Sequence, residues 1–306
     1  MGKDVKWYDY FKDNQRYADI INGVGCEGQQ VVSQEDLTEL DTRSKNKSRD
    51  LVCKAALGVN FAIIGIENQD EVDYELPVRM MEYDVTRYRQ QVSAISKKVR
   101  KNKEKLQPGE YMYGFRKDNK LYPVVTFVLY AGKEIWDGPL CLHDMIDFTD
   151  IPESLKKLIQ NYNIIVVDIR RLKDTNVFKT DVRQVFDFIR CAEDWNALFE
   201  LVNGDSYYQK MDEEAYEVIS KYANLNEVVK MDEYKREDGG VDVCKGIQDL
   251  MENSRQEGRN EGINQGESLL AQLVQLLLKA DRIQEIDKAT ANKEYREQLY
   301  KEFKLV

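Results

Sequence analysis

Residues 50–69 restrict the fold more than any other segment, because they combine a hairpin pattern with a carboxylate at each end. Asp50 precedes the run LVCKAAL, Gly58-Val59-Asn60 is a tight-turn signal, and the apolar run FAIIGI leads directly to Glu67. Two short apolar runs separated by such a signal predict two antiparallel strands. A hairpin folded about the centre of this turn places Asp50 almost opposite Glu67.

Two carboxylates in this arrangement predict a divalent metal site. Directly opposed strand residues have side-chain stems roughly 5 Å apart, and two carboxylates at that distance repel unless a cation lies between them. Asp50, Glu67 and the main-chain carbonyl of Asn68 would supply the oxygen ligands that Mg²⁺ prefers, with Mn²⁺ as an alternative ion. The bound ion would activate a water for attack on a phosphodiester. The competing interpretation is a pair of solvated strand ends.

Gln69 is the third candidate catalytic residue. It shares a face with Glu67 because side chains alternate along a strand, and its amide would position the water or a phosphate oxygen. A neutral amide adds no Coulombic stabilisation of developing charge. Lys54 would supply a charge but lies four residues, about 13 Å, along the strand from Asp50. Asp19, near the end of the first expected helix, is a candidate for a further metal ligand.

A polar stripe and a basic run after the hairpin predict contacts with nucleic acid. The helix expected from Pro77 has an apolar face that includes Val78 and Val85, and its polar stripe would hold phosphates or form an ordinary solvated face. The basic run that follows is the best DNA-backbone candidate in so acidic a chain. The nucleic-acid-binding candidates are Arg79, Arg87, Gln90, Lys97, Lys98, Arg100, Lys101 and Lys103.

The remaining patterns predict an α/β domain followed by a helical region. The run YNIIVVDI at 162–169 is typical of a central strand buried on both faces. Composition becomes charged and helix-forming after Asn203, which predicts domains at 1–203 and 204–306. Helices are expected at 4–22, 180–203, 244–280 (as one helix or two) and 293–303, and a strand at 121–130.

Composition excludes several classes of protein. The formal net charge of −10 is not that of a chain coated for nucleic acid, so any such surface is local. Five scattered Cys and one His give no zinc pattern and favour reduced thiols, and His143 is interpreted as structural. The absence of an apolar leader or of a run long enough to span a bilayer predicts a soluble cytoplasmic protein without a membrane partner.

Several short strings occur in the order found in one known family. RYADIINGVGCEGQQVV, RD, IGIENQ, LPVRMMEYD and YRQQ, all within about residues 15–95, resemble the Rpn recombination-promoting nucleases, or PD-(D/E)XK nuclease family transposases. The likeness extends more weakly to about residue 200. It implies a restriction-endonuclease-like core, a mixed sheet flanked by helices, with a helical C-terminal extension. It also implies that Asp50 and Glu67 occupy the two acidic positions of the motif. Glu67 and Gln69 would then form the E-x-Q variant of its E-x-K part.

The expected function is therefore magnesium-dependent DNA cleavage linked to recombination or mobile elements. Two alternatives stay open: a weakly active or inactive DNA-binding protein of the same fold, and an RNA-cleaving or defence nuclease. The C-terminal helices are expected to form a homodimer. Gly258, Gly262 and Gly266 recur every four residues there, which suits either close approach of a partner helix or a solvated linker.

Overall fold

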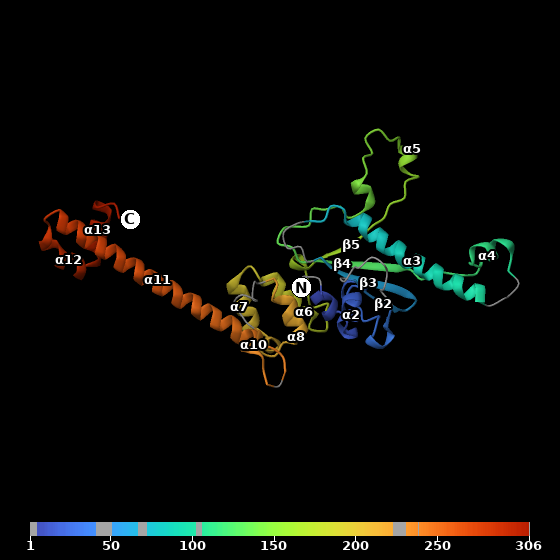
Figure 1. Cartoon of the computed structure of the whole chain (residues 1–306), viewed down its shortest axis with the longest axis horizontal. Coiled ribbons are helices and arrows are strands. Elements are labelled where there is room, and N and C mark those ends of the chain that lie inside the picture. The colour runs from blue at the N-terminus through green and yellow to red at the C-terminus, as the bar shows by residue number, and fades with distance from the viewer. Residues whose placement is uncertain are drawn as a thin grey trace. The chain divides into compact units, whose positions relative to one another are not determined.

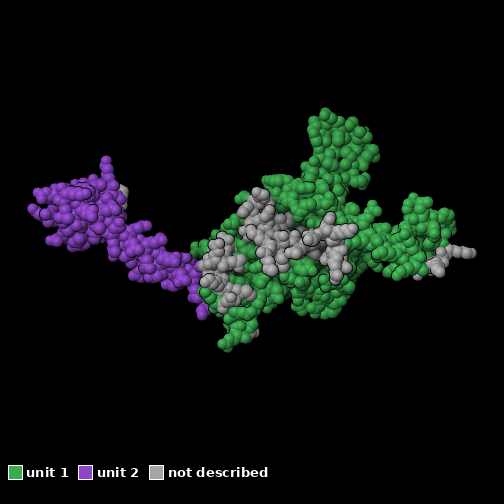
Figure 2. All heavy atoms as spheres, viewed as in Figure 1, with its two compact units in different colours: residues 1–244 green, residues 245–306 purple. Residues whose placement is uncertain are grey.

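The computed structural model describes residues 5–40, 51–66, 72–101, 106–222, 231–237 and 239–305. It divides into two compact units, residues 1–244 and residues 245–306 (Figure 2). Unit 1 thus continues past Asn203, where the composition changes. The reason is that α8 (Glu213–Ile219) packs on α1 (Val5–Tyr10) and α6 (Val182–Cys191), and the Trp7 indole donates to the Tyr222 hydroxyl at 2.9 Å.

Five strands in the described part of unit 1 form one mixed sheet in the order β1-β2-β3-β4-β5. The first three strands are antiparallel neighbours, whereas β4 is parallel to β3 and β5 is parallel to β4. Helices flank this sheet, so the α/β class expected from the sequence is confirmed (Figure 1). The strands are β1 Thr38–Glu39, β2 Leu51–Ala56, β3 Val59–Ile66, β4 Val124–Tyr130 and β5 Ile165–Asp168.

The hairpin is confirmed, but its turn is centred one residue earlier than expected, which shifts the pairing of β2 with β3 by two residues. Leu57 and Gly58 form the turn and both have positive φ, 52° and 76°, the signature of a two-residue type I′ turn. Val59 and Asn60 therefore belong to β3. Leu51 pairs with Ile64, whereas a hairpin with Asp50 opposite Glu67 would pair Leu51 with Ile66.

The position expected for β5 was wrong. In the described part of the sheet β5 is an edge strand, not a central one. Val167 is buried on one face, and Ile164 and Val166 pack against the cluster on the other, but Ile165 is 41% exposed. The apolar run thus forms an edge strand of the described sheet, with Ile164 and Val166 packed on the cluster beneath α3.

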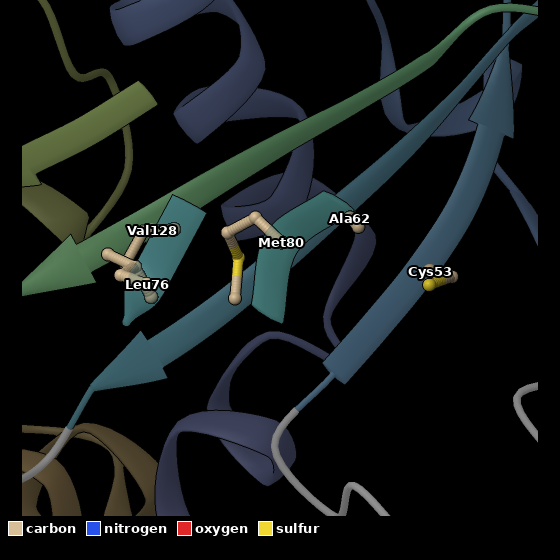
Figure 3. Close-up of a cluster of buried hydrophobic side chains, with 5 residues drawn as sticks. All are labelled: Cys53, Ala62, Leu76, Met80 and Val128. Atoms are coloured by element: carbon tan, nitrogen blue, oxygen red, sulfur yellow. The ribbon is translucent and has the colours of Figure 1, made fainter. Parts of the chain in front are cut away.

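Helix α3 (Leu76–Lys101) covers one face of the sheet. Leu76 and Met80 lie over Ala62 and Val128, and Cys53 completes this buried cluster (Figure 3). The apolar face expected for α3 was wrong, because Val85 is 51% exposed while Asp84 and Arg87 are buried. Leu76 and Met80 determine which face of α3 packs on the sheet at the start of the helix. Farther along, Asp84 does so through its hydrogen bonds with Thr126 and Tyr162.

The N-terminal helices and α6 form the layer on the opposite face. The helix expected at 4–22 is in fact α1, a break, and α2 (Asn14–Ile20), because Asp13 caps α2 by accepting from the main-chain N–H groups of Gln15 and Arg16. The Tyr17 hydroxyl lies 3.0 and 2.8 Å from the main-chain oxygens of Val52 and Phe61. The other helices of unit 1 are α4 Pro108–Tyr113, α5 Glu153–Lys156, α7 Trp195–Gly204 and α10 Met231–Tyr234.

Unit 2 consists of one long helix and a short helical hairpin. Helix α11 (Val243–Lys279) begins at the end of unit 1 and is a single helix, as one of the two sequence interpretations predicts. Its last turns pack Leu273 and Leu277 against Ala289 of α12 (Ile286–Ala291) and Leu299 of α13 (Lys293–Glu302). This small core orders the C-terminal end of α11.

Candidate active site and nucleic-acid interface

Asp50, Glu67, Asn68 and Gln69 lie outside the described residues, so their roles stay predictions. The strands that flank them are described. The end of β2 that leads to Asp50 and the end of β3 that leads to Glu67 lie at the same edge of the sheet, since the two strands are antiparallel. The candidate site therefore belongs to the side of the sheet that holds the C-terminal ends of the parallel strands β3, β4 and β5; this side is called the candidate edge below.

The described groups at this edge include residues that the sequence interpretation missed. Ile66 pairs with Tyr130, and Tyr130 with Asp168, so Asp168 ends β5 in line with the end of β3. Its carboxylate forms an ion pair with Arg171 at 3.0 Å. Burial, with a smaller effect of Asp168, raises the pKa of Tyr130. The same signal that identifies Glu67, an apolar run ending in an acid, would have identified Asp168.

A pocket of about 560 Å³ lies between the segment before α3 and the loop after β4. The Tyr74 hydroxyl donates to Asp137 at 2.9 Å, and this hydrogen bond raises the pKa of Tyr74. Asp144, on the same pocket, accepts from the main-chain N–H groups of Leu140 and Cys141, which lowers its pKa. Asp137 and Asp144 make the pocket acidic, which suits a cation better than a phosphate.

Asp19 is buried, and donors already surround its carboxylate. The main-chain N–H groups of Lys179 and Thr180 and the Thr180 hydroxyl donate to it at 2.7–2.9 Å. Asp19 thus ties α2 to the segment that leads into α6. It would have to give up some of these donors to bind an ion, so its role as a metal ligand stays a prediction.

Lys54 is buried, and its ammonium group points away from the candidate site. Its Nζ donates to the main-chain oxygen of Lys12 at 2.6 Å and to Asn14 Oδ1 at 2.7 Å, and it lies 4.7 Å from the centre of the Tyr17 ring. Burial lowers the pKa of Lys54 to about 8. The sequence-based judgement that Lys54 lies too far along β2 to replace a catalytic lysine agrees with these contacts.

The expected polar stripe of α3 is largely engaged within the molecule. Arg79 forms an ion pair with Asp73. Arg87 is buried and donates to Gln90 Oε1 at 2.8 Å. Gln91 accepts from the main-chain N–H of Tyr122 and donates to its oxygen, which joins the helix to the approach to β4. Contact of Arg79, Arg87 and Gln90 with nucleic acid stays a prediction, and the half-buried Arg79, with its side chain 43% exposed, is the best placed of the three.

A buried polar cluster that the sequence did not reveal lies beneath α3. Asp84 accepts from the Thr126 hydroxyl and from the Tyr162 hydroxyl, both at 2.7 Å. Burial, reinforced by this hydrogen bond, raises the pKa of Tyr162. The three residues come from α3, β4 and the segment before β5, so the cluster fixes the helix on the sheet. No local spacing joins Asp84 to partners 42 and 78 residues away.

The basic residues at the end of α3 are solvent-exposed. Lys97, Lys98, Arg100 and Lys101 have exposed side chains and form no ion pair within the described part of the chain, and Lys103 lies outside it. Helix α3 leaves the candidate edge at Leu76 and runs back along β4. Its basic end thus lies about 37 Å from its start, at 1.5 Å per residue.

Other expectations concern the whole of the described chain. All five Cys lie in the described ranges and are free thiols, as expected. His143 lies 3.1 Å from the Ile159 oxygen and packs edge-to-face on Phe148, which are structural contacts. Among the described residues, no three His, Cys, Asp or Glu side chains are grouped as metal ligands. The described helices include none with the length and apolarity needed to cross a membrane.

The family model Transposase_31, described as a YhgA-like transposase, matches residues 40–214. This region contains β2 to β5, α3 and the whole expected catalytic hairpin. No curated protein and no solved structure matches the chain.

Proposed function

We propose that this chain, which belongs to the YhgA-like transposases of the Rpn/PD-(D/E)XK family, is a metal-dependent DNA endonuclease with a restriction-endonuclease-like core. The observation that supports the proposal is that the end of β2 next to Asp50 in the chain and the end of β3 next to Glu67 lie at the same end of the mixed sheet. Cleavage would serve recombination or the movement of mobile elements.

The donor set at this edge suits a hard divalent ion. Asp50, Glu67 and the main-chain carbonyl of Asn68 are the oxygen ligands proposed to hold Mg²⁺ or Mn²⁺. When bound, the ion would neutralise charge on the phosphate and lower the pKa of a water. Gln69 would orient that water through its amide. Asp168 and Asp137, at the end of β5 and in the nearby pocket, are further carboxylates that would attract the ion to this edge.

Exposed cations supply the affinity for DNA. Phosphate contacts give most of the non-specific affinity of such proteins and make it dependent on salt. Arg79 is close to the start of α3, and Lys97, Lys98, Arg100 and Lys101 form its exposed end. The two groups would contact one strand of DNA at separate places, with Lys103 as a further candidate.

Self-association through α11 is part of the proposal. Gly258, Gly262 and Gly266 are exposed, and a Cβ atom at any of them would have no neighbour within 4 Å. The exposed Ile263 lies between the last two. A second copy of α11 would bury this surface, and a dimer would supply two sites for the two strands of a duplex.

The substitution of Gln69 for the usual lysine favours a second candidate, a DNA-binding protein with weak or no hydrolysis. Gln adds no positive charge where charge develops. This candidate predicts binding that needs no metal, and no cleavage with any divalent ion.

The test is nicking of supercoiled plasmid DNA with Mg²⁺, with Mn²⁺ and with EDTA. Glu67→Gln and Asp50→Asn are expected to reduce cleavage at least ten- to a hundredfold, since even residues that support metal ligands contribute about that much. Glu82→Gln, which removes one exposed charge from α3, is the matched control and should cleave like the wild type.

Equal cleavage by wild type and both site variants would eliminate the assignment of Asp50 and Glu67. Absence of cleavage by the wild type with every ion, together with DNA binding in EDTA, would leave the second candidate. An RNA substrate cleaved faster than DNA in the same assay would make the protein a ribonuclease.

A further inference from the structure

The far end of α3 and α4 form a small projection from unit 1 (Figure 1). Gln91 joins α3 to Tyr122 in the approach to β4, and the helix then continues for ten residues, about 15 Å. Helix α4 packs back on this extension at its own end. Gly114, the αL cap of α4, leaves no room for a Cβ atom, which would lie 2.2 Å from Ser96 Oγ and 3.1 Å from Arg100 Nε.

Large apolar side chains are exposed at this projection. Tyr111, Met112 and Tyr113 are 76%, 67% and 72% exposed, and they are consecutive. Helix α4 has no buried residue, so these side chains do not support the core of unit 1. Grouped exposed apolar residues mark an interaction site more often than scattered ones do.

The segment that contains these side chains is rich in positive charge. Residues 97–120 contain nine Lys and Arg against three Asp and Glu, in a chain whose net charge is −10. One of the three acids, Glu110, is occupied by the main-chain N–H groups of Gln107 and Lys117, and another, Asp118, forms an ion pair with Arg116. The exposed lysines and arginine at the end of α3 therefore meet little local neutralisation.

We propose that this basic–aromatic tip, defined as Lys97, Lys98, Arg100 and Lys101 with Tyr111, Met112 and Tyr113, binds single-stranded DNA. Cations track the phosphates of a single strand while aromatic rings stack on its unpaired bases. A paired base hides its faces in the helical stack, so exposed tyrosines favour unpaired over paired DNA. The positive charge of the tip complements the phosphates of DNA, which favours single-stranded DNA over an uncharged apolar partner.

The tip would hold DNA away from the cleavage edge. Helix α3 runs from Leu76, which packs on Val128 near the end of β4, to Gln91, which contacts Tyr122 before β4 begins. The tip thus lies beyond the opposite edge of the sheet, about 37 Å from the start of α3. The inference rests on the proposed function only in naming DNA as the nucleic acid.

The test measures binding in EDTA by fluorescence anisotropy, with labelled dT20 and a blunt duplex of equal length. The wild type should bind dT20 more tightly than the duplex. Tyr111→Ala combined with Tyr113→Ala should weaken dT20 binding at least tenfold, because stacking contributes about 1–3 kcal/mol per base and 1.4 kcal/mol is tenfold. The corresponding Tyr→Phe pair should bind like the wild type, since it keeps both rings.

The contribution of the lysines is tested separately, through the salt dependence of dT20 binding. Lys97→Ala combined with Lys98→Ala should reduce the slope of log affinity against log salt concentration by about 1.4, or about 0.7 per lost phosphate contact. The tyrosine variants should leave that slope unchanged. Trp195→Ala, which removes an exposed aromatic ring from α7, is the control and should not alter dT20 binding. Unchanged thermal unfolding would show that each variant is folded.

Unchanged dT20 affinity in the tyrosine pair, equal affinity for dT20 and duplex, or tighter binding of rU20 would each overturn the proposal. Loss of self-association in the tyrosine pair without loss of dT20 binding would instead make the tip a protein contact. Binding in EDTA is independent of cleavage. Tip-dependent binding without cleavage would overturn only the proposed nuclease activity. Cleavage by the wild type, with dT20 binding unaltered in the tyrosine pair, would overturn only the proposed role of the tip.

Discussion

Lys54 is the clearest case of a single side chain whose environment determines a measurable property. Its ammonium is buried under α2 with two oxygen acceptors, and burial lowers its pKa to about 8 from an ordinary value of 10.5. Between pH 8 and 10.5 the unfolded chain therefore binds more protons at Lys54 than the folded chain. The free energy of unfolding contributed by this residue must rise with pH across that window.

We predict that Lys54→Met removes this pH dependence. The difference between the unfolding free energies at pH 10 and pH 7 should be smaller in Lys54→Met than in the wild type by about 1–3 kcal/mol. Urea unfolding at both pH values measures it. Lys97→Met, at an exposed position, is the control and should behave like the wild type. The same difference in Lys54→Met and the wild type would contradict the lowered pKa.

Single residues were the level at which the sequence predicted least. Asp19 was recognised as a special carboxylate, but its donors lie 160 and 161 residues away. Arg87 was placed on a polar stripe, yet it is buried because the neighbouring turn of α3 packs Asp84 on the hydroxyls of Thr126 and Tyr162. Periodicity identifies a face of a helix. Which face is buried depends on partners distant in the chain.

The hairpin turn shows how an element depends on two residues. Leu57 has φ of 52°, in the left-handed region that costs an ordinary L-residue about 1–2 kcal/mol. Asn-Gly is the preferred pair in a type I′ turn because both residues accept positive φ. The leucine side chain is exposed, so little packing offsets its strain.

Leu57→Asn is therefore expected to stabilise unit 1 by about 0.5–1 kcal/mol. Gly58→Ala should destabilise it by about 1 kcal/mol or more, because Gly58 also requires positive φ. Thermal or urea unfolding of both variants provides the measurement. Stabilisation by Gly58→Ala, or destabilisation by Leu57→Asn, would show that the turn is not of this type.

At the level of elements the sequence predicted the main helices and strands of both units. The hairpin, α3, β4, α6, α7, α11 and α13 all occur where apolar periodicity and turn residues indicate them. Two details escaped prediction for local reasons. Asp13 interrupts the first helix because its side chain caps α2, and Leu57 adopts a conformation that leucine rarely takes, which shifted the turn and the register of β2 on β3.

At the scale of the whole molecule, the proposed self-association depends on whether a second helix packs on the exposed middle of α11. Each glycine in a helix interior costs about 1 kcal/mol relative to alanine. If a second helix approaches closely, Gly258→Ala combined with Gly262→Ala should weaken the dimer, and sedimentation should show more monomer at a given concentration. Asn260→Ala with Asn264→Ala, at the same spacing on another face, should leave the dimer intact. Unaltered association and a more stable helix would establish a solvated linker.

The hydrogen bond between Trp7 and Tyr222 can form only late in the synthesis of the chain, because it joins residues 215 positions apart. Trp7 packs on Phe186 and Tyr222, residues that the ribosome adds long after α1. At 5–20 residues per second, the 215 residues between the two ends take about 10–40 s to make. Until then Trp7 lacks this hydrogen bond and this ring contact, although α1 can already pack on β3 and Phe186. Truncation of the chain before Tyr222 would leave the indole N–H of Trp7 without its acceptor.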